Sequence, residues 1–119
     1  MTQIRPVLDI PLFHKIYELY KLLYSYHARI PKVHRYTLWQ KIEETTLTLL
    51  ETLIETSHNQ GGERLQTLYV LSHRLDLLKV LMRLAKETRA IDAKQYLMIQ
   101  TLLQEIGKMT GGWIKSVPR

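Results

Sequence analysis

The sequence predicts an all-α protein, an antiparallel bundle of four helices joined up-down-up-down. Apolar residues recur every three or four positions, which is the period of an α-helix. No segment alternates apolar and polar residues for long enough to indicate a strand. Proline and glycine are few, 4 and 5 residues, and they divide the chain into four helical segments with short connections. Short connections bring successive helices side by side in opposite directions, which is the topology of such a bundle.

The length allows one folded domain. The 119 residues can bury a hydrophobic core but leave no room for a second folding unit. We therefore expect a single domain over residues 1–119, with helices at about residues 10–29, 33–58, 63–89 and 92–114. Hydrophobic residues make up 45% and charged residues 24%, a composition typical of a globular rather than a disordered protein.

Polar residues and prolines mark where the first two helices begin and end. Asp9 is placed to cap the first helix, Pro11 is tolerated in its first turn, and Pro31 ends it. For the second helix, Thr37 and Gln40 have the spacing of a capping box, in which each side chain bonds the other residue's backbone N–H. An earlier start, just after the proline, is also compatible with the sequence.

The last two helices are bounded by a glycine turn and by a second capping pattern. Residues 58–62 form a polar turn that ends in two glycines, and Glu63 suits the positive start of the third helix. Residues 90–92 break the pattern again, and Asp92 with Gln95 repeats the capping-box spacing. The fourth helix is expected to start there.

The second and third helices carry more apolar surface than one core requires. A helix that faces a single core needs an apolar stripe of roughly 100°, and these two helices extend well beyond it. One interpretation is a generous core with ordinary apolar exposure. We favour the other, burial against further copies of the chain, since large exposed apolar patches are rare on monomers. The predicted interface residues are Leu47, Ile54, Leu77, Leu81 and Leu84.

Two charges interrupt these apolar arcs, Glu43 on the second helix and Arg74 on the third. Counted from the turn, they stand at similar heights on neighbouring helices. The hypothesis is a partly buried ion pair that fixes the alignment of the two helices. The alternative is that each side chain reaches water independently.

Positive charge is concentrated in the second half of the chain. The sequence has 17 basic and 11 acidic residues, a net charge of +6. Residues 1–63 hold seven of each sign, whereas residues 64–119 hold ten basic and four acidic side chains. An excess of this kind favours an acidic partner, such as nucleic acid or an acidic protein surface.

The predicted topology gathers many of these cations at one end of the bundle. The ends of the first and third helices meet the starts of the second and fourth there, with only Glu87 and Asp92 in opposition. Such a cluster binds phosphates without regard to base sequence. The alternative is a solvated face whose cations complement helix dipoles. The residues at this end are Arg29, Lys32, Arg35, Lys41, Arg83, Lys86, Arg89 and Lys94.

The usual signatures of an enzyme or a metal protein do not occur. The chain has no cysteine, and its 5 histidines lack the spacing of metal ligands. The glycine pairs are not followed by the residues of a phosphate-binding loop. We expect no enzymatic activity, no cofactor and no metal site. No apolar run reaches the ~20 residues of a membrane span and no signal peptide is recognised, so a cytoplasmic protein is expected.

Four segments together resemble a known family. They are DIPLFHK at residues 9–15, IPKVHRYTL at 30–38, LMRLAK at 81–86 and EIGKMTGGWIK at 105–115, and the last is the most specific. In this order they resemble the accessory variability determinant proteins of diversity-generating retroelements. That family is related to the four-helix bundles encoded in ribosomal RNA intervening sequences.

The resemblance implies a non-enzymatic partner of a retroelement reverse transcriptase. Proteins of this family form homopentameric barrels of four-helix protomers, and bind the reverse transcriptase and nucleic acid. They support the mutagenic copying of a template RNA into cDNA. One departure is Trp39, where a small glycine is expected, and a bulky indole there would alter local packing or a subunit contact.

The binding residues are predicted from two sources. Those on segments that match the family are Lys32, Arg35, Arg83 and Lys86. Those added from charge geometry alone are Arg74, Lys79 and Arg89. All are assigned to contact with reverse transcriptase or RNA.

Two other functions remain open from the sequence. An intervening-sequence-type bundle would be a nucleic-acid- or protein-binding module of unknown role. A pure protein–protein adaptor would show no salt-dependent binding of RNA.

Overall fold

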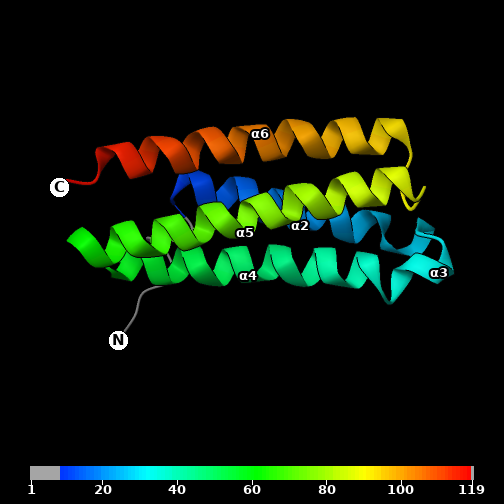
Figure 1. Ribbon diagram of the computed structural model, residues 1–119, viewed down its shortest axis with the longest axis horizontal. Coiled ribbons are helices and arrows are strands. Elements are labelled where there is room, and N and C mark those ends of the chain that lie inside the picture. The colour runs from blue at the N-terminus through cyan, green and yellow to red at the C-terminus, as the bar shows by residue number, and fades with distance from the viewer. Residues whose placement is uncertain (1–8, 119) are drawn as a thin grey trace.

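The computed structural model describes residues 9–118 and is all-helical (Figure 1). Four long helices lie side by side in a body of 44 × 28 × 20 Å. No residue in the described range is in a strand. The prediction of an all-α helical bundle is therefore confirmed. The long helices are α2 (Pro11–Tyr26), α4 (Leu38–His58), α5 (Gly61–Glu87) and α6 (Ala93–Ser116).

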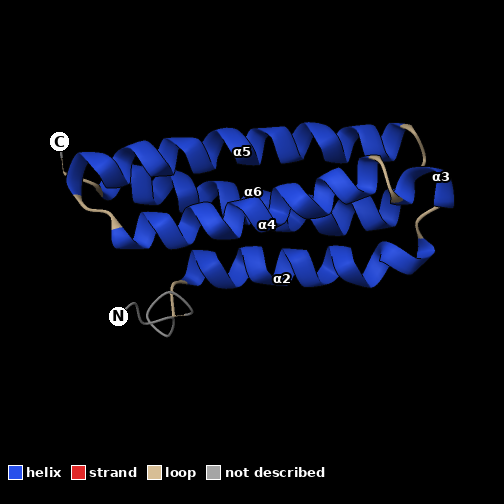
Figure 2. Cartoon of the chain, turned by 90° about the horizontal axis from the view of Figure 1, so that it is seen from below, coloured by secondary structure: helices blue, strands red, loops and turns tan. Residues whose placement is uncertain are grey.

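The long helices surround one core in the order α2, α4, α5, α6. Each contacts two neighbours, and α6 packs back against α2. Helices α2 and α5 lie on opposite sides of the bundle (Figure 2). The chain reverses its direction along the bundle at each connection, as the colours in Figure 1 show. The connections from α2 to α4 and from α5 to α6 lie at one end, which we call the α3 end.

The core consists of the apolar helix faces that the helical period predicted. Residues on these faces, such as Ile16, Leu49, Leu68 and Leu103, are fully buried. Trp39 is also 0% exposed and packs in this core. Of the two effects expected of Trp39, on local packing or on a subunit contact, its position inside the protomer supports the effect on local packing. Its Nε1 atom has no hydrogen-bond partner among the described residues.

Asp9 does not cap the first helix. Helix α2 starts at Pro11 with Ile10 as its N-cap, and no side chain bonds the free backbone N–H groups. Proline in the first turn is as predicted, because its missing N–H would have no partner there in any case. At its other end α2 tightens into a 3₁₀ turn, η1 (His27–Arg29), where the N–H of Ile30 bonds the carbonyl groups of Tyr26 and His27.

The second predicted helix is divided in two. A single turn, α3 (Lys32–Arg35), precedes α4, and the predicted capping box at Thr37 is wrong. The hydroxyl of Thr37 donates backward to the carbonyl oxygens of Val33 (3.2 Å) and His34 (3.4 Å). The turn that α3 makes puts those acceptors within reach, so the hydroxyl satisfies them and not the start of α4.

The second capping box is confirmed. The N–H of Gln95 donates to Oδ1 of Asp92 at 2.7 Å, and the N–H of Asp92 donates to Oε1 of Gln95 at 2.9 Å. Helix α6 therefore starts directly after Asp92, where two otherwise free backbone donors are satisfied.

Helix α5 is longer at its start and shorter at its end than the predicted 63–89. It begins at Gly61, whose φ of 56° is a left-handed conformation that glycine adopts without strain. It ends in a Schellman motif, in which Ala90 N–H bonds the Ala85 carbonyl and Arg89 N–H bonds the Lys86 carbonyl. Arg89 has a φ of 64°, so an arginine stands where glycine is usual.

Glu43 and Arg74 do not pair, which overturns the predicted ion pair. Glu43 lies 3.1 Å from Nδ1 of His27, whereas Arg74 donates to the hydroxyl of Thr52. Side chains on a helix lean toward its N-terminus. Because α4 and α5 run in opposite directions, the two side chains lean away from each other, toward opposite ends of the bundle.

Candidate nucleic-acid and partner interface

The α3 end brings together the cations that the sequence placed there. The end of α2, all of α3, the start of α4, the end of α5 and the start of α6 meet at this end (Figure 1). A concentration of one charge sign raises the local potential and attracts polyanions. We call this group of residues the basic pole: Arg29, Lys32, Arg35, Lys41, Arg83, Lys86, Arg89 and Lys94.

Some cations of the basic pole are held by the protein itself. The guanidinium of Arg35 donates to the carbonyl oxygens of Ala28 (3.1 Å) and Ile30 (3.0 Å), so it ties α3 to the turn before it. Lys86 Nζ lies 4.8 Å from the centre of the Tyr96 ring. Arg83 contacts Glu87 at 3.3 Å, but both side chains are more than half exposed and the pair is weak.

Other cations of the basic pole are free to meet a partner. Lys32, Lys41, Arg89 and Lys94 are exposed and have no ion-pair partner within residues 9–118. The left-handed conformation of Arg89 places it directly at the corner between α5 and α6. These four side chains are the most accessible positive charges at this end.

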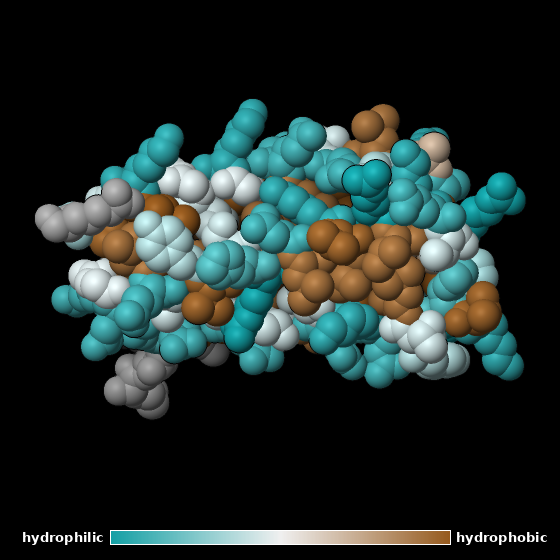
Figure 3. Space-filling model, viewed as in Figure 1, coloured by the Kyte–Doolittle hydropathy of each residue, from teal (hydrophilic) through white to brown (hydrophobic). Residues whose placement is uncertain are grey.

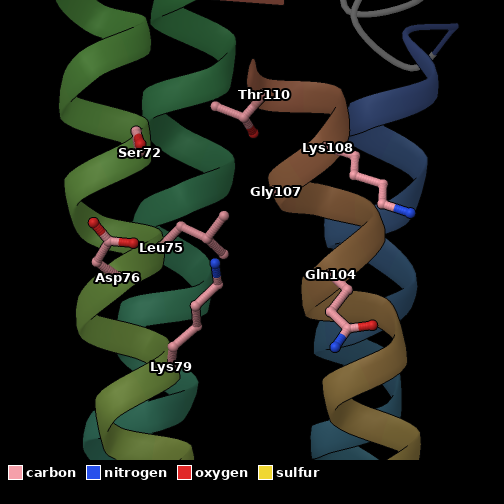
Figure 4. Close-up of a pocket in the computed structure, with 8 residues that line it drawn as sticks. All are labelled: Ser72, Leu75, Asp76, Lys79, Gln104, Gly107, Lys108 and Thr110. Atoms are coloured by element: carbon pink, nitrogen blue, oxygen red, sulfur yellow. The ribbon is translucent and has the colours of Figure 1, made fainter. Parts of the chain in front are cut away.

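Arg74 and Lys79 lie away from the basic pole, nearer the middle of α5. Arg74 is half-buried at the seam between α5 and α4, where it donates to Thr52. Lys79 lies in a cleft of about 380 Å³ between α5 and α6 (Figure 4). Its Nζ atom is 3.5 Å from the point where a Cβ on Gly107 would stand. A Cβ at position 107 would therefore stand in ordinary van der Waals contact with the ammonium group.

The cleft between α5 and α6 is lined by several polar side chains, but these side chains do not point toward one common position. Lys79 extends into the gap between the helices, whereas Lys108 extends away from α5 (Figure 4). Lys79, Arg83 and Lys86 are spaced i, i+4 and i+7. Because Lys79 and Lys86 both contact α6, this row of cations follows the seam between α5 and α6 toward the basic pole.

Exposed apolar residues form one stripe on α5. Leu77, Val80 and Leu84 are 43%, 58% and 43% exposed, and their spacing puts them on one face. Apolar surface gathers on the face formed by α5, toward the α3 end (Figure 3). Leu81, predicted for the same interface, is only 9% exposed and belongs to the core, so it has little surface left for a partner.

A second apolar stripe lies on α4, on another side of the bundle. Leu47 and Ile54 are 39% and 40% exposed and lie two helical turns apart. They share a helix face with Glu43, which contacts α2 through His27. The α5 stripe instead borders α4 on its opposite side. The predicted interface residues therefore divide between two separate faces of the protomer.

The sequence did not predict a cleft between α2 and α4. It has a volume of about 270 Å³ and is lined by Tyr20, Tyr24, His27, Ala28 and Glu43. Burial, and next the carboxylate of Glu43, raise the pKa of the Tyr20 phenol above its usual 10.0, so the hydroxyl stays protonated. The tyrosines recur at i and i+4, but only packing shows which residue of α4 they meet.

Within the part of the chain that the structure describes, no three His, Asp or Glu side chains gather closely enough to hold a metal ion. None of its helices is sufficiently long and apolar to cross a membrane.

The fold and these surfaces define a four-helix-bundle protein with a basic pole and two exposed apolar stripes. A family model described as bAvd-like matches residues 12–117, and the chain belongs to this family, the accessory variability determinant proteins of retroelements. The resemblance carried by the four sequence segments is thereby confirmed. No curated protein and no solved structure shows a significant match to the chain.

Proposed function

We propose that the protein is a non-enzymatic accessory protein of a diversity-generating retroelement. It binds the element's reverse transcriptase and its template RNA or cDNA, in the cytoplasm, and supports mutagenic copying. Family membership supports the retroelement context. The observation that carries the binding role is the basic pole, where Lys32, Lys41, Arg89 and Lys94 are exposed and unpaired within the described chain.

The proposal includes a ring of antiparallel four-helix protomers. A ring requires that one face of each copy meet a different face of the next. The apolar stripes on α5 and α4 supply two different faces of this kind. Five copies is the number that the family resemblance implies.

Such a ring acts as a scaffold. Each protomer repeats the basic pole, so the ring presents several cationic surfaces to one RNA. Linking weak sites in this way raises the effective concentration of the bound molecules. Template RNA and polymerase are held together in this way, and no residue of the protein breaks or forms a bond.

Size-exclusion chromatography with mass detection, with and without structured RNA across a salt series, tests the proposal. We expect an oligomer that binds RNA more weakly as salt rises, because each phosphate contact releases counterions. Replacing Lys32 and Arg89 by Ala should reduce both affinity and salt slope. Lys115→Ala, an exposed lysine at the opposite end of the bundle, is the matched control. A monomer that ignores RNA at low salt would refute the proposal.

Binding of the reverse transcriptase is measured separately by co-purification. Capture of the polymerase without salt-sensitive RNA binding would show a protein–protein adaptor instead. Replacing Arg83 and Lys86 by Ala should weaken this capture, since both residues lie on a segment that matches the family.

A further inference from the structure

The single turn α3 presents an apolar and an aromatic side chain to solvent. Val33 and the neighbouring Tyr36 are 74% and 65% exposed, and no residue of α3 is buried. Val33 is the most exposed large apolar residue in the described range. The turn therefore adds no buried side chain to the core, and its outer face is available to a partner.

Hydrogen bonds hold this turn in place. On one side, the guanidinium of Arg35 donates to two carbonyl oxygens of the segment that precedes α3. On the other side, the hydroxyl of Thr37 donates to the carbonyl oxygen of Val33 at 3.2 Å. Tyr36 stands between Arg35 and Thr37, so a fixed backbone carries its ring. A ring presented in this way loses little conformational entropy when a ligand packs on it.

Positive charge flanks Tyr36 along the chain. Residues 28–42 contain four lysines and arginines and no acidic residue. Lys32 stands one helical turn before Tyr36, and Lys41 stands one turn after Thr37, whose carbonyl its N–H bonds at 3.1 Å. Both lysines are exposed and have no ion-pair partner within residues 9–118. Proteins that hold single strands combine cations for the phosphates with aromatic rings on which the bases stack.

The composition of this surface favours a nucleic acid over a protein partner. The core of a protein interface is depleted in lysine, and a stable interface buries roughly 800 Å² on each partner. On α3, by contrast, two exposed apolar side chains stand next to free lysines. A polyanion that carries flat bases matches both the charges and the ring.

The proposed subunit contacts leave α3 uncovered. The apolar stripes assigned to those contacts lie on α4 and α5, and none of their residues belongs to α3. The turn lies at the end of the bundle, beyond the long helices (Figure 1). A strand can therefore reach Tyr36 without displacing a neighbouring copy.

The exposed ring also distinguishes an unpaired strand from a duplex. The bases of a duplex stack on one another, and an RNA duplex presents mainly phosphates and 2′-hydroxyl groups to a protein. Tyr36 can stack only on a base that has left such a stack. A surface that binds phosphates alone would instead favour the duplex, because the duplex has the higher charge density.

We propose that α3 is a single-strand site, in which an unpaired base stacks on Tyr36 while Lys32 and Lys41 contact phosphates on either side. Template RNA and cDNA both offer such bases, and neither contact involves the 2′-hydroxyl group. This inference rests on the proposed function. It adds a preference for unpaired over paired strands, which charge alone does not supply.

Fluorescence anisotropy with the intact protein tests the inference. The probes are a short labelled RNA strand, the DNA strand of the same sequence, and the RNA strand paired with its complement. We expect both single strands to bind about tenfold more tightly than the duplex, a ratio in the range of one stacked base.

Variants of the exposed ring locate the preference. Tyr36→Ala should weaken binding of both single strands by about tenfold and leave the duplex unchanged. Tyr36→Phe keeps the ring and should bind like the wild type. The matched control is Tyr69→Ala, a tyrosine that is 44% exposed on α5, and it should change no affinity. Because Tyr36 is largely exposed, its replacement removes no core contact, and circular dichroism should show unchanged helicity.

The outcomes separate the inference from the proposed function. Equal or tighter binding of the duplex, or unchanged single-strand affinity of Tyr36→Ala, overturns the single-strand site, whereas salt-sensitive RNA binding keeps the proposed function. No binding of any strand overturns both. If Tyr36→Ala loses capture of the reverse transcriptase while its RNA affinity is unchanged, α3 contacts the polymerase and the inference is also overturned. A loss of affinity for RNA alone, or for DNA alone, supports the site and identifies the strand that occupies it.

Discussion

The Nδ1 atom of His27 lies 3.1 Å from Oε1 of Glu43, and this contact joins the end of α2 to α4. The sequence had suggested Arg74 as the partner of this carboxylate, but in the structure the partner is His27. Arg74 in turn bonds Thr52, closer to the turn between α4 and α5. Two polar contacts therefore tie α4 to its two neighbours, one on each side.

Reversing both charges of Glu43 and Arg74 together should not rescue the damage of either single reversal, because the two side chains do not meet. A double-mutant cycle between His27→Ala and Glu43→Gln should instead show coupling, below about 1 kcal/mol since the histidine is partly exposed. Urea denaturation measures both. Rescue by the double reversal would contradict the observed pairing.

Asp92→Ala should lower the free energy of unfolding by about 1 kcal/mol, because it removes the capping box of α6. Asp9→Ala serves as the comparison and should have little effect, since Asp9 caps no helix. Chemical denaturation of the two variants provides the measurement. Equal losses would argue against a special role for Asp92.

Arg89→Gly should make the protein more stable and at the same time weaken its binding of RNA. Glycine relieves the left-handed conformation at φ 64°, so we expect a gain of roughly 0.5–1 kcal/mol in the free energy of unfolding. The lost charge should at the same time weaken RNA binding. Arg83→Gly, in the interior of α5, is the contrast and should cost about 1 kcal/mol. Unchanged RNA affinity of Arg89→Gly would remove Arg89 from the binding surface.

Leu84→Glu and Leu47→Glu should each disrupt the oligomer, because each puts a charge on one of the two apolar stripes. Mixed together, the two variants should form pairs that do not grow. Each retains the stripe that the other has lost, and a ring contact uses two different faces. Mass-resolved chromatography of the single variants and the mixture distinguishes this arrangement. A mixture of monomers only would contradict it.

The protein should lose stability as the pH rises above about 10. Burial raises the pKa of Tyr20 and of Tyr26 above 10.0, so the phenols ionise in the unfolded chain first. The unfolded state then binds fewer protons than the folded state, and the free energy of unfolding falls with rising pH. Tyr20→Phe and Tyr26→Phe should each reduce this slope, measured by denaturation between neutral and alkaline pH. An unchanged slope in both variants would contradict the assignment.

Some helix boundaries can be predicted from the local sequence, and others cannot. The capping box at Asp92 was predictable because both partners lie within one turn of the same helix. The same spacing failed at Thr37, where the single turn of α3 offers nearer acceptors to the hydroxyl. The division between α3 and α4 leaves no comparable signal in the sequence.

The candidate surfaces likewise include features that the sequence predicted and features that it did not. The exposed stripe on α5 and the gathering of cations at the α3 end follow from helical period and chain order, so the sequence predicted both. Leu81 was misplaced because a residue at the border of a stripe turns inward or outward with a small rotation of its helix. Arg35 was predicted to contact reverse transcriptase or RNA, and nothing in the sequence indicated that its guanidinium also bonds two backbone carbonyl groups.

The sequence by itself determined the four helices and the faces they bury, because both follow from apolar residues spaced three to seven positions apart. It also determined the uneven distribution of charge, which follows from the order of the residues. Only the tertiary structure decided that Glu43 meets His27, that Arg74 meets Thr52, and that two tyrosines and a carboxylate line one pocket. Such contacts depend on how far each helix is rotated and shifted against its neighbours. The packing of the whole core fixes those rotations, and no local pattern records them.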